Sequence, residues 1–285
     1  MKLTNLILGF ALTSLTIGMQ ACKKTTASTT TDEFETTFEL SGDQAVTDYV
    51  IEDANDILNE AAIENNFSGN RLSDQSSATQ TMNLLSCASV TVTPLQGFPK
   101  NIVLDFGTGC TSGNGVTRKG KILIAISDSL RKSGSVAVMT FDGFYVNNFK
   151  KEGTITWTNT SSAGTKSWQR KAENGKITAP DGKYWLHSGT KNIVQVAGVT
   201  TPHNLLDDVY SITGDHTVTN AAGKTRTSTI IEALEKKVIC ENIDKGKVKI
   251  QGPNHFAVLD YGDGTCDRVA TISIDGRDPR TILLR

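Results

Sequence analysis

From residue 89 to its end, the chain consists of short alternating segments separated by turn signals. Asn-Gly, Asp-Gly and similar pairs, such as those at 174–175 and 275–276, recur roughly every 8 to 14 residues. Between them lie segments such as residues 154–158, in which threonine alternates with Ile155 and Trp157. No stretch has the length and period of a crossover helix, so neighbouring strands should be antiparallel. We therefore predict a mainly β protein built from one large antiparallel meander of about a dozen strands.

One amphipathic helix is predicted ahead of this region, over residues 43–64. Ser41 and Gln44 have the spacing of a capping box. An apolar stripe, which should pack on the sheet, recurs at intervals of three and four residues and comprises Val46, Val50, Ala54, Ile57 and Ala61. Residues 230–238 are the one helical-looking segment among the strands, and they could equally form a strand pair.

The sequence also contains two copies of one strand–strand–turn unit. Val-Leu-Asp-Phe-Gly at 103–107 and Val-Leu-Asp-Tyr-Gly at 258–262 each precede a cysteine and follow another. The cysteines are Cys87 and Cys110 in the first copy, and Cys240 and Cys266 in the second. Four cysteines allow three connectivities, and the repeat favours Cys87–Cys110 and Cys240–Cys266. Reduced thiol pairs are the alternative, while the spacing disfavours a zinc site because no pair is separated as in C-x₂₋₄-C.

The N-terminus has the features of an export signal. Lys2 precedes an apolar run over residues 3–19 that is too short and too weakly apolar for a membrane span. The run ends in Met19-Gln20-Ala21-Cys22, which resembles a bacterial lipobox, where the cysteine sulfur receives a diacylglycerol. An ordinary secretory signal with a cysteine nearby is the alternative. Lipidation of Cys22 would leave an even number of cysteines, as expected for disulfides in an oxidising compartment. We predict a signal peptide over 1–21, a flexible tether over 22–40 and a single β-rich domain over 41–285.

Charge and motifs exclude several functions. Lys and Arg number 29 against 30 Asp and Glu, so the chain lacks the basic footprint of a nucleic-acid-binding protein. It also lacks a G-x-S-x-G elbow, a phosphate-binding loop and a zinc-protease pattern. We predict no cofactor and no enzyme activity. A hydrolase would require a serine and a carboxylate near one of the four histidines, which we expect in loops or at the surface: His187, His203, His216 and His255.

Two groups of residues are candidate ligand sites. Asp260, Asp263 and Asp267 lie in a glycine-rich turn and could bind calcium, but turn capping is favoured and no metal is predicted. The aromatic residues of the central strands could stack on sugar rings if exposed, or belong to the core if buried. They are Trp157, Trp168, Trp185 and Tyr184, and Trp157 shares a face with Ile155, which favours the core.

These features together resemble an uncharacterised lipoprotein family of the Bacteroidota. The matching pieces are the start at residues 19–24 and the segments 104–110, 117–122, 140–147, 208–214 and 259–267. The resemblance implies an outer-membrane lipoprotein and implies no activity. Surface-exported members usually carry acidic residues soon after the lipidated cysteine. Here Lys23 and Lys24 come first, and Asp32 is the earliest acid, so we expect an anchor that faces the periplasm.

We therefore expect a non-catalytic structural or binding protein of the cell envelope. Its expected partners are the membrane, through the lipid on Cys22, and an envelope glycan or protein. The alternative is a carbohydrate- or lipid-binding protein that uses a concave face of the sheet.

Overall fold

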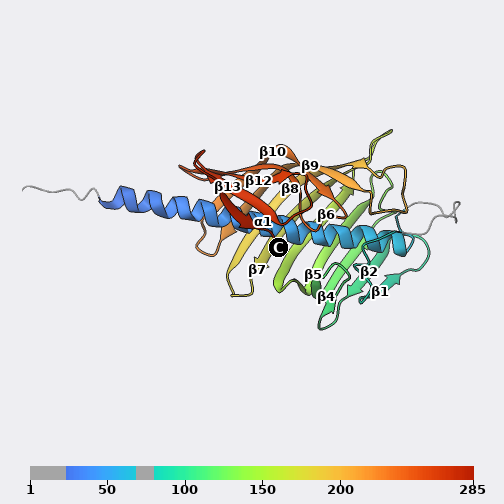
Figure 1. Ribbon diagram of the computed structural model, residues 1–285. Helices are drawn as coiled ribbons and strands as arrows, with labels where there is room; N and C mark the ends of the chain where they lie inside the picture. The colour runs from blue at the N-terminus through green and yellow to red at the C-terminus, as the bar shows by residue number, and fades with distance from the viewer. Residues whose placement is uncertain (1–23, 69–79) are drawn as a thin grey trace, which may run out of the picture.

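The computed structural model describes residues 24–68 and 80–285, which form one helix and one antiparallel sheet of 14 strands (Figure 1). Each strand of the main path pairs with the next one along the chain, except that β2 pairs with β4. The short β3 also pairs with β4, beside this path. The predicted meander is confirmed. Its strands are β1 (Ser89–Thr93), β2 (Lys100–Asp105), β3 (Cys110–Thr111), β4 (Thr117–Ile126), β5 (Val136–Val146), β6 (Phe149–Asn159), β7 (Ser167–Thr178), β8 (Tyr184–Ala197), β9 (Val209–Asn220), β10 (Thr225–Lys237), β11 (Lys245–Gln251), β12 (Phe256–Asp263), β13 (Val269–Ile274) and β14 (Arg280–Leu283).

The sheet curves without closing on itself. β1 and β14 end the strand order, and each has a neighbour on one side only. Several strand pairs contain a register shift, and a bulge of this kind bends a strand and increases its twist. Residues 230–238, which looked helical in the sequence, lie almost entirely in β10, whose pairing with β11 shifts after Ile230.

Gly120 shows why one of these bends needs a glycine. The register of β4 against β5 shifts between Lys119 and Lys121, and Gly120 has a φ of 80°. A Cβ at this position would lie 2.0 Å from the carbonyl oxygen of Gly143 on the neighbouring strand. The backbone of Gly120 also hydrogen-bonds to Phe106 and Gly107 of the first repeat unit. A side chain here would therefore push β4 and β5 apart where the sheet bends.

Replacing Gly120 with alanine is expected to lower the free energy of unfolding by roughly 2–3 kcal/mol, because the clash adds to the strain of a positive φ. Gly113→Ala is the matched control, since a Cβ at Gly113 would meet nothing within 4 Å. Urea denaturation of both variants measures the difference. Equal midpoints for the two variants would contradict this account of the bend.

The helix α1 (Lys24–Glu64) is longer than the sequence predicted. The helix was predicted to begin at residue 43, but it begins earlier and includes residues 24–40 of the segment for which a flexible tether was predicted. Ser41, the predicted cap, donates its hydroxyl hydrogen to the carbonyl of Thr37 one turn earlier at 2.7 Å. Thr37 does the same to Glu33 at 2.9 Å. Such bonds let hydroxyl residues remain inside a helix. The predicted signal peptide over 1–21 and Cys22 lie outside the described residues.

The sheet wraps around α1, so the helix is buried on nearly every side along its C-terminal half. Figure 1 shows α1 running along the inside of the curve, with its first turns projecting beyond the strands. The predicted stripe packs in the core, with Val50, Ala54 and Ile57 fully buried. Asp48 and Glu52, which do not belong to this stripe, are also buried. The prediction of an amphipathic helix was therefore incomplete, because acidic residues outside the apolar stripe are buried as well. No helix in the described ranges has the length and apolarity to cross a bilayer.

Candidate functional site

The enclosed helix and the inner face of the sheet carry opposite charges. Buried carboxylates along α1 pair with lysines and arginines of the strands and of one turn. Because a buried charge without a partner is costly, these contacts hold α1 in one position and rotation. The pairs are Asp43–Lys183 at 2.8 Å, Glu52–Arg170 at 2.5 Å, Asp56–Lys236 at 2.9 Å, and the direct contacts Asp48–Lys191 and Asp53–Arg118.

Two of these pairs interlock. Arg170 on β7 lies directly opposite Lys191 on β8 in the strand register, and like charges in that arrangement repel. Asp48 and Glu52 are four residues apart on α1, so they lie on one helix face and meet Lys191 and Arg170 respectively. One turn of the helix therefore neutralises the two facing bases of the sheet.

Asp48 has the most complete hydrogen bonding among the buried acids. Besides Lys191, it accepts hydrogen bonds from the Tyr261 hydroxyl at 2.8 Å and the Gln44 amide at 3.0 Å. Burial alone would raise the pKa of Asp48, but Lys191 and these donors hold that pKa below its usual value. By contrast, burial raises the pKa of Asp56 to about 6, even with Lys236 beside it. Tyr261 belongs to the second repeat unit, which thereby contributes directly to the interior.

Three buried bases form a chain that no acid of α1 neutralises directly. The Nζ atom of Lys151 lies 2.8 Å from Nε2 of His187, whose Nδ1 lies 3.1 Å from Nε2 of His216. Burial lowers the pKa of Lys151 to about 7 and that of His216 to about 3. Burial, with the nearby positive charges of Lys151 and Lys191, also brings the pKa of His187 well below its usual value. The two histidines are therefore neutral hydrogen-bonding groups near neutral pH, whereas Lys151 gains its proton as the pH falls through about 7.

The four histidines do not form a hydrolytic site in the described part of the chain. His187 and His216 are buried, so the expectation of surface positions is wrong for both. Ser228 donates to the backbone oxygen of His216, not to its ring. His255 pairs with Asp275 at 2.6 Å, and His203 is half-buried near the bridge to Gln80.

The predicted aromatic and acidic groups have structural roles. Trp157, Trp168 and Trp185 are buried, with the Trp185 indole donating to Thr47 at 2.8 Å, while Tyr184 is half-buried. Asp260, Asp263 and Asp267 each accept a hydrogen bond from a backbone N–H two residues later, as capping residues do.

The cysteines pair as the repeat predicted. Cys87–Cys110 and Cys240–Cys266 are disulfides with Cα separations of 5.7 and 5.3 Å, closing 23 and 26 residues of chain. In each bridge one cysteine is buried and the other exposed. Cys240 of the second bridge lines a cavity of about 230 Å³ together with Leu84 and Asn114, which flank the first bridged segment in the sequence. Asp53 and Asp56 of α1 also line this cavity.

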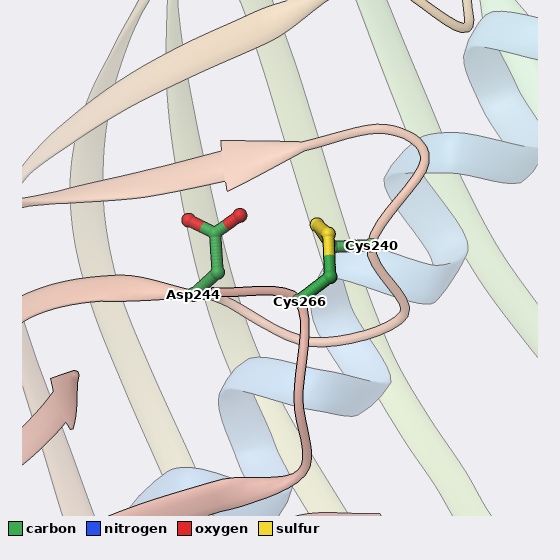
Figure 2. Close-up of side chains that lie close together, drawn as sticks. All are labelled: Cys240, Asp244 and Cys266. Atoms are coloured by element: carbon green, nitrogen blue, oxygen red, sulfur yellow. A yellow bond between two sulfur atoms is a disulfide. The ribbon is translucent and has the colours of Figure 1, made fainter. Parts of the chain in front are cut away.

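The second disulfide has an unusual neighbour. Cys240, Asp244 and Cys266 place their sulfur and carboxylate atoms within 4.8 Å of one another, and they form the one such group of metal-ligand types in the described residues (Figure 2). Asp244 is 2 % exposed, and neither of its carboxylate oxygens accepts a hydrogen bond. Lys237 provides an ion pair at 3.3 Å. Asp244 stands four residues after Cys240 and belongs to none of the motifs recognised in the sequence.

The buried bases can be recognised in the sequence, because each stands on the apolar face of a strand. Arg170 shares its strand face with Trp168 and Ala172, and Lys191 shares its face with Ile193. A base on the apolar face of a strand predicts a buried acid opposite. Comparison with known proteins adds nothing to this geometry: the chain matches no family model, no curated protein and no solved structure.

Proposed function

We propose that this protein is a lipoprotein of the Bacteroidota outer membrane, anchored through Cys22 and facing the periplasm. The helix α1 carries the proposal, because it begins at Lys24, close to Cys22, and its C-terminal half is held inside the sheet by buried ion pairs. An anchor at Cys22 would thus stand two residues before the first residue of this helix. Two disulfides also suit an exported protein in an oxidising compartment.

We infer a non-catalytic, structural or binding role with an envelope glycan or protein as partner. The support is that α1 occupies the inner face of the sheet, where its buried acids meet bases of the strands. Binding of a carbohydrate or lipid on a concave sheet face has no support, because α1 occupies that face and the three tryptophans are buried. A partner would therefore contact the outer surface of the strands or the connecting loops.

Cys22→Ala is expected to abolish acylation and to release the protein from the membrane fraction. Cells grown with a labelled fatty acid, then fractionated, measure both effects. The wild-type protein should carry the label, sediment with outer membranes and resist protease added to intact cells. Cys87→Ala is the matched control, because it removes a cysteine but leaves Cys22 in place. An unlabelled wild-type protein in the soluble periplasmic fraction would contradict the anchor and favour an ordinary secretory signal.

A further inference from the structure

The Cys240–Cys266 disulfide combines an exposed cysteine residue with a nearby buried acid. Cys266 is exposed, whereas Cys240 is 3 % exposed and faces the protein interior. Figure 2 shows the carboxylate of Asp244 projecting beside the disulfide. Lys237 is the ion-pair partner of this carboxylate at 3.3 Å, and the carboxylate also lies within 4.8 Å of both sulfur atoms.

The backbone around Asp244 holds this arrangement together. Its N–H donates to Glu235 of β10 at 3.1 Å, and its carbonyl accepts from Gly264 at 2.8 Å. The loop that carries Cys266 is thus tied to the residue that carries the carboxylate. The charged groups facing Asp244 are on β10: Lys237, Glu235 and Lys236.

We propose that Cys240–Cys266 is an exchange-competent disulfide that oxidises a partner dithiol, with Asp244 carrying the proton of Cys240. A partner thiolate attacks the exposed Sγ of Cys266, the S–S bond breaks, and its electron pair leaves on Sγ of Cys240. The Asp244 carboxyl gives its proton to the Cys240 thiolate. The second thiol of the partner then attacks the mixed disulfide, releases Cys266 and passes its proton to that sulfur. The proton lost by the first partner thiol returns to Asp244 through solvent.

The net reaction transfers two electrons from the dithiol to the disulfide and leaves two thiols in the protein. In the reverse direction, Asp244 accepts the proton of Cys240 as the bridge forms. Burial raises the pKa of Asp244 above its usual value although Lys237 opposes the shift, and a raised pKa favours the protonated carboxyl that this step uses. The inference does not depend on membrane attachment, because every group involved lies in the β domain.

The other disulfide is a control within the same molecule. Cys87–Cys110 also has one exposed and one buried cysteine. In the described residues, no acid or histidine completes a group of metal-ligand types at Cys87–Cys110 as Asp244 does at Cys240–Cys266. The two bridges thus each have one exposed and one buried cysteine, and the nearby buried carboxyl distinguishes them.

The test is a time course of the oxidised full-length protein in dithiothreitol, with acid quenching, alkylation and peptide mapping of each bridge. At pH 7 we expect Cys240–Cys266 to open about tenfold faster than Cys87–Cys110, which is a modest effect for proton transfer by a positioned acid. Asp244→Asn should remove most of that difference in rate. Asp244→Glu should restore part of the rate. Asp267→Asn, which changes an exposed carboxylate next to Cys266, should leave it unchanged.

Two results would overturn the proposal: equal opening rates for the bridges in the wild-type protein, or an Asp244→Asn rate with the wild-type value and pH dependence. Thermal melting of each oxidised variant separates a loosened loop from a lost proton donor. If Asp244→Asn does not fold, the comparison of the two bridges in the wild-type protein still decides. The Cys22→Ala fractionation is independent of these outcomes, so failure of the anchor and failure of the exchange are distinguishable.

Discussion

Replacing Lys191 with methionine is expected to lower the free energy of unfolding by about 3–5 kcal/mol, the usual cost of leaving one partner of a buried ion pair uncompensated. Methionine has a similar length, so the loss is one of charge rather than of packing. Asp48 would remain 0 % exposed with only the neutral donors Tyr261 and Gln44. Urea denaturation at pH 7 measures the change.

Two further variants identify charge as the cause. Adding Asp48→Asn to Lys191→Met should recover part of the loss, because the double variant leaves no lone carboxylate at residue 48. Lys171→Met removes a lysine paired with Glu173 at the surface, where both side chains are about half exposed, and should change stability by less than about 1 kcal/mol. A cost for Lys191→Met as small as that for Lys171→Met would contradict the role of the buried pairs.

Replacing Lys151 with methionine is expected to stabilise the protein, by about 3 kcal/mol at pH 6. Burial lowers the pKa of Lys151 from 10.5 to about 7. Each unit corresponds to about 1.4 kcal/mol, so charging this lysine costs the folded state roughly 4–5 kcal/mol below pH 7. Loss of the hydrogen bond to His187 offsets about 1 kcal/mol of the gain.

The pH dependence gives the sign of this effect. Lys151 has no cost to the folded state above pH 10.5, its pKa in the unfolded chain, because it is neutral in both states there. The cost of charging it in the folded state develops as the pH falls from 10.5 to about 7, so stability is lost over that range. The advantage of Lys151→Met should therefore be largest at pH 6–7 and vanish near pH 10. Lys150→Met, at a partly exposed lysine paired with Glu152, is the control and should show no such trend. A destabilised Lys151→Met protein at pH 6 would refute the prediction.

The sheet was predictable because its determinants are local. Turn signals and alternation mark each strand, and every strand pairs with a sequence neighbour, so no long-range information is needed to order them. The disulfide pairing followed from the repeat for the same reason, since each bridge lies within one copy.

The interior could not be predicted because its determinants are distant. Asp48 meets Lys191 across 143 residues and Tyr261 across 213. In isolation, the acids of α1 have the pattern of a solvated face. Bases on the strands and on one turn, all distant in the sequence, make the burial of these acids tolerable. The early start of α1 was missed because threonines and serines favour caps and turns in an isolated chain, whereas here Ser41 bonds back into the helix.

The enclosed helix also has a consequence for biosynthesis. Hairpins of the meander can form in the order in which the strands are made, because their contacts are local. The helix precedes every strand in the chain, yet its contacts include β12 and β13 near the end. The segment made first is therefore the last to be covered. Until those strands arrive, Asp48 and its neighbouring acids lie in water, where their charge favours solubility of the incomplete chain.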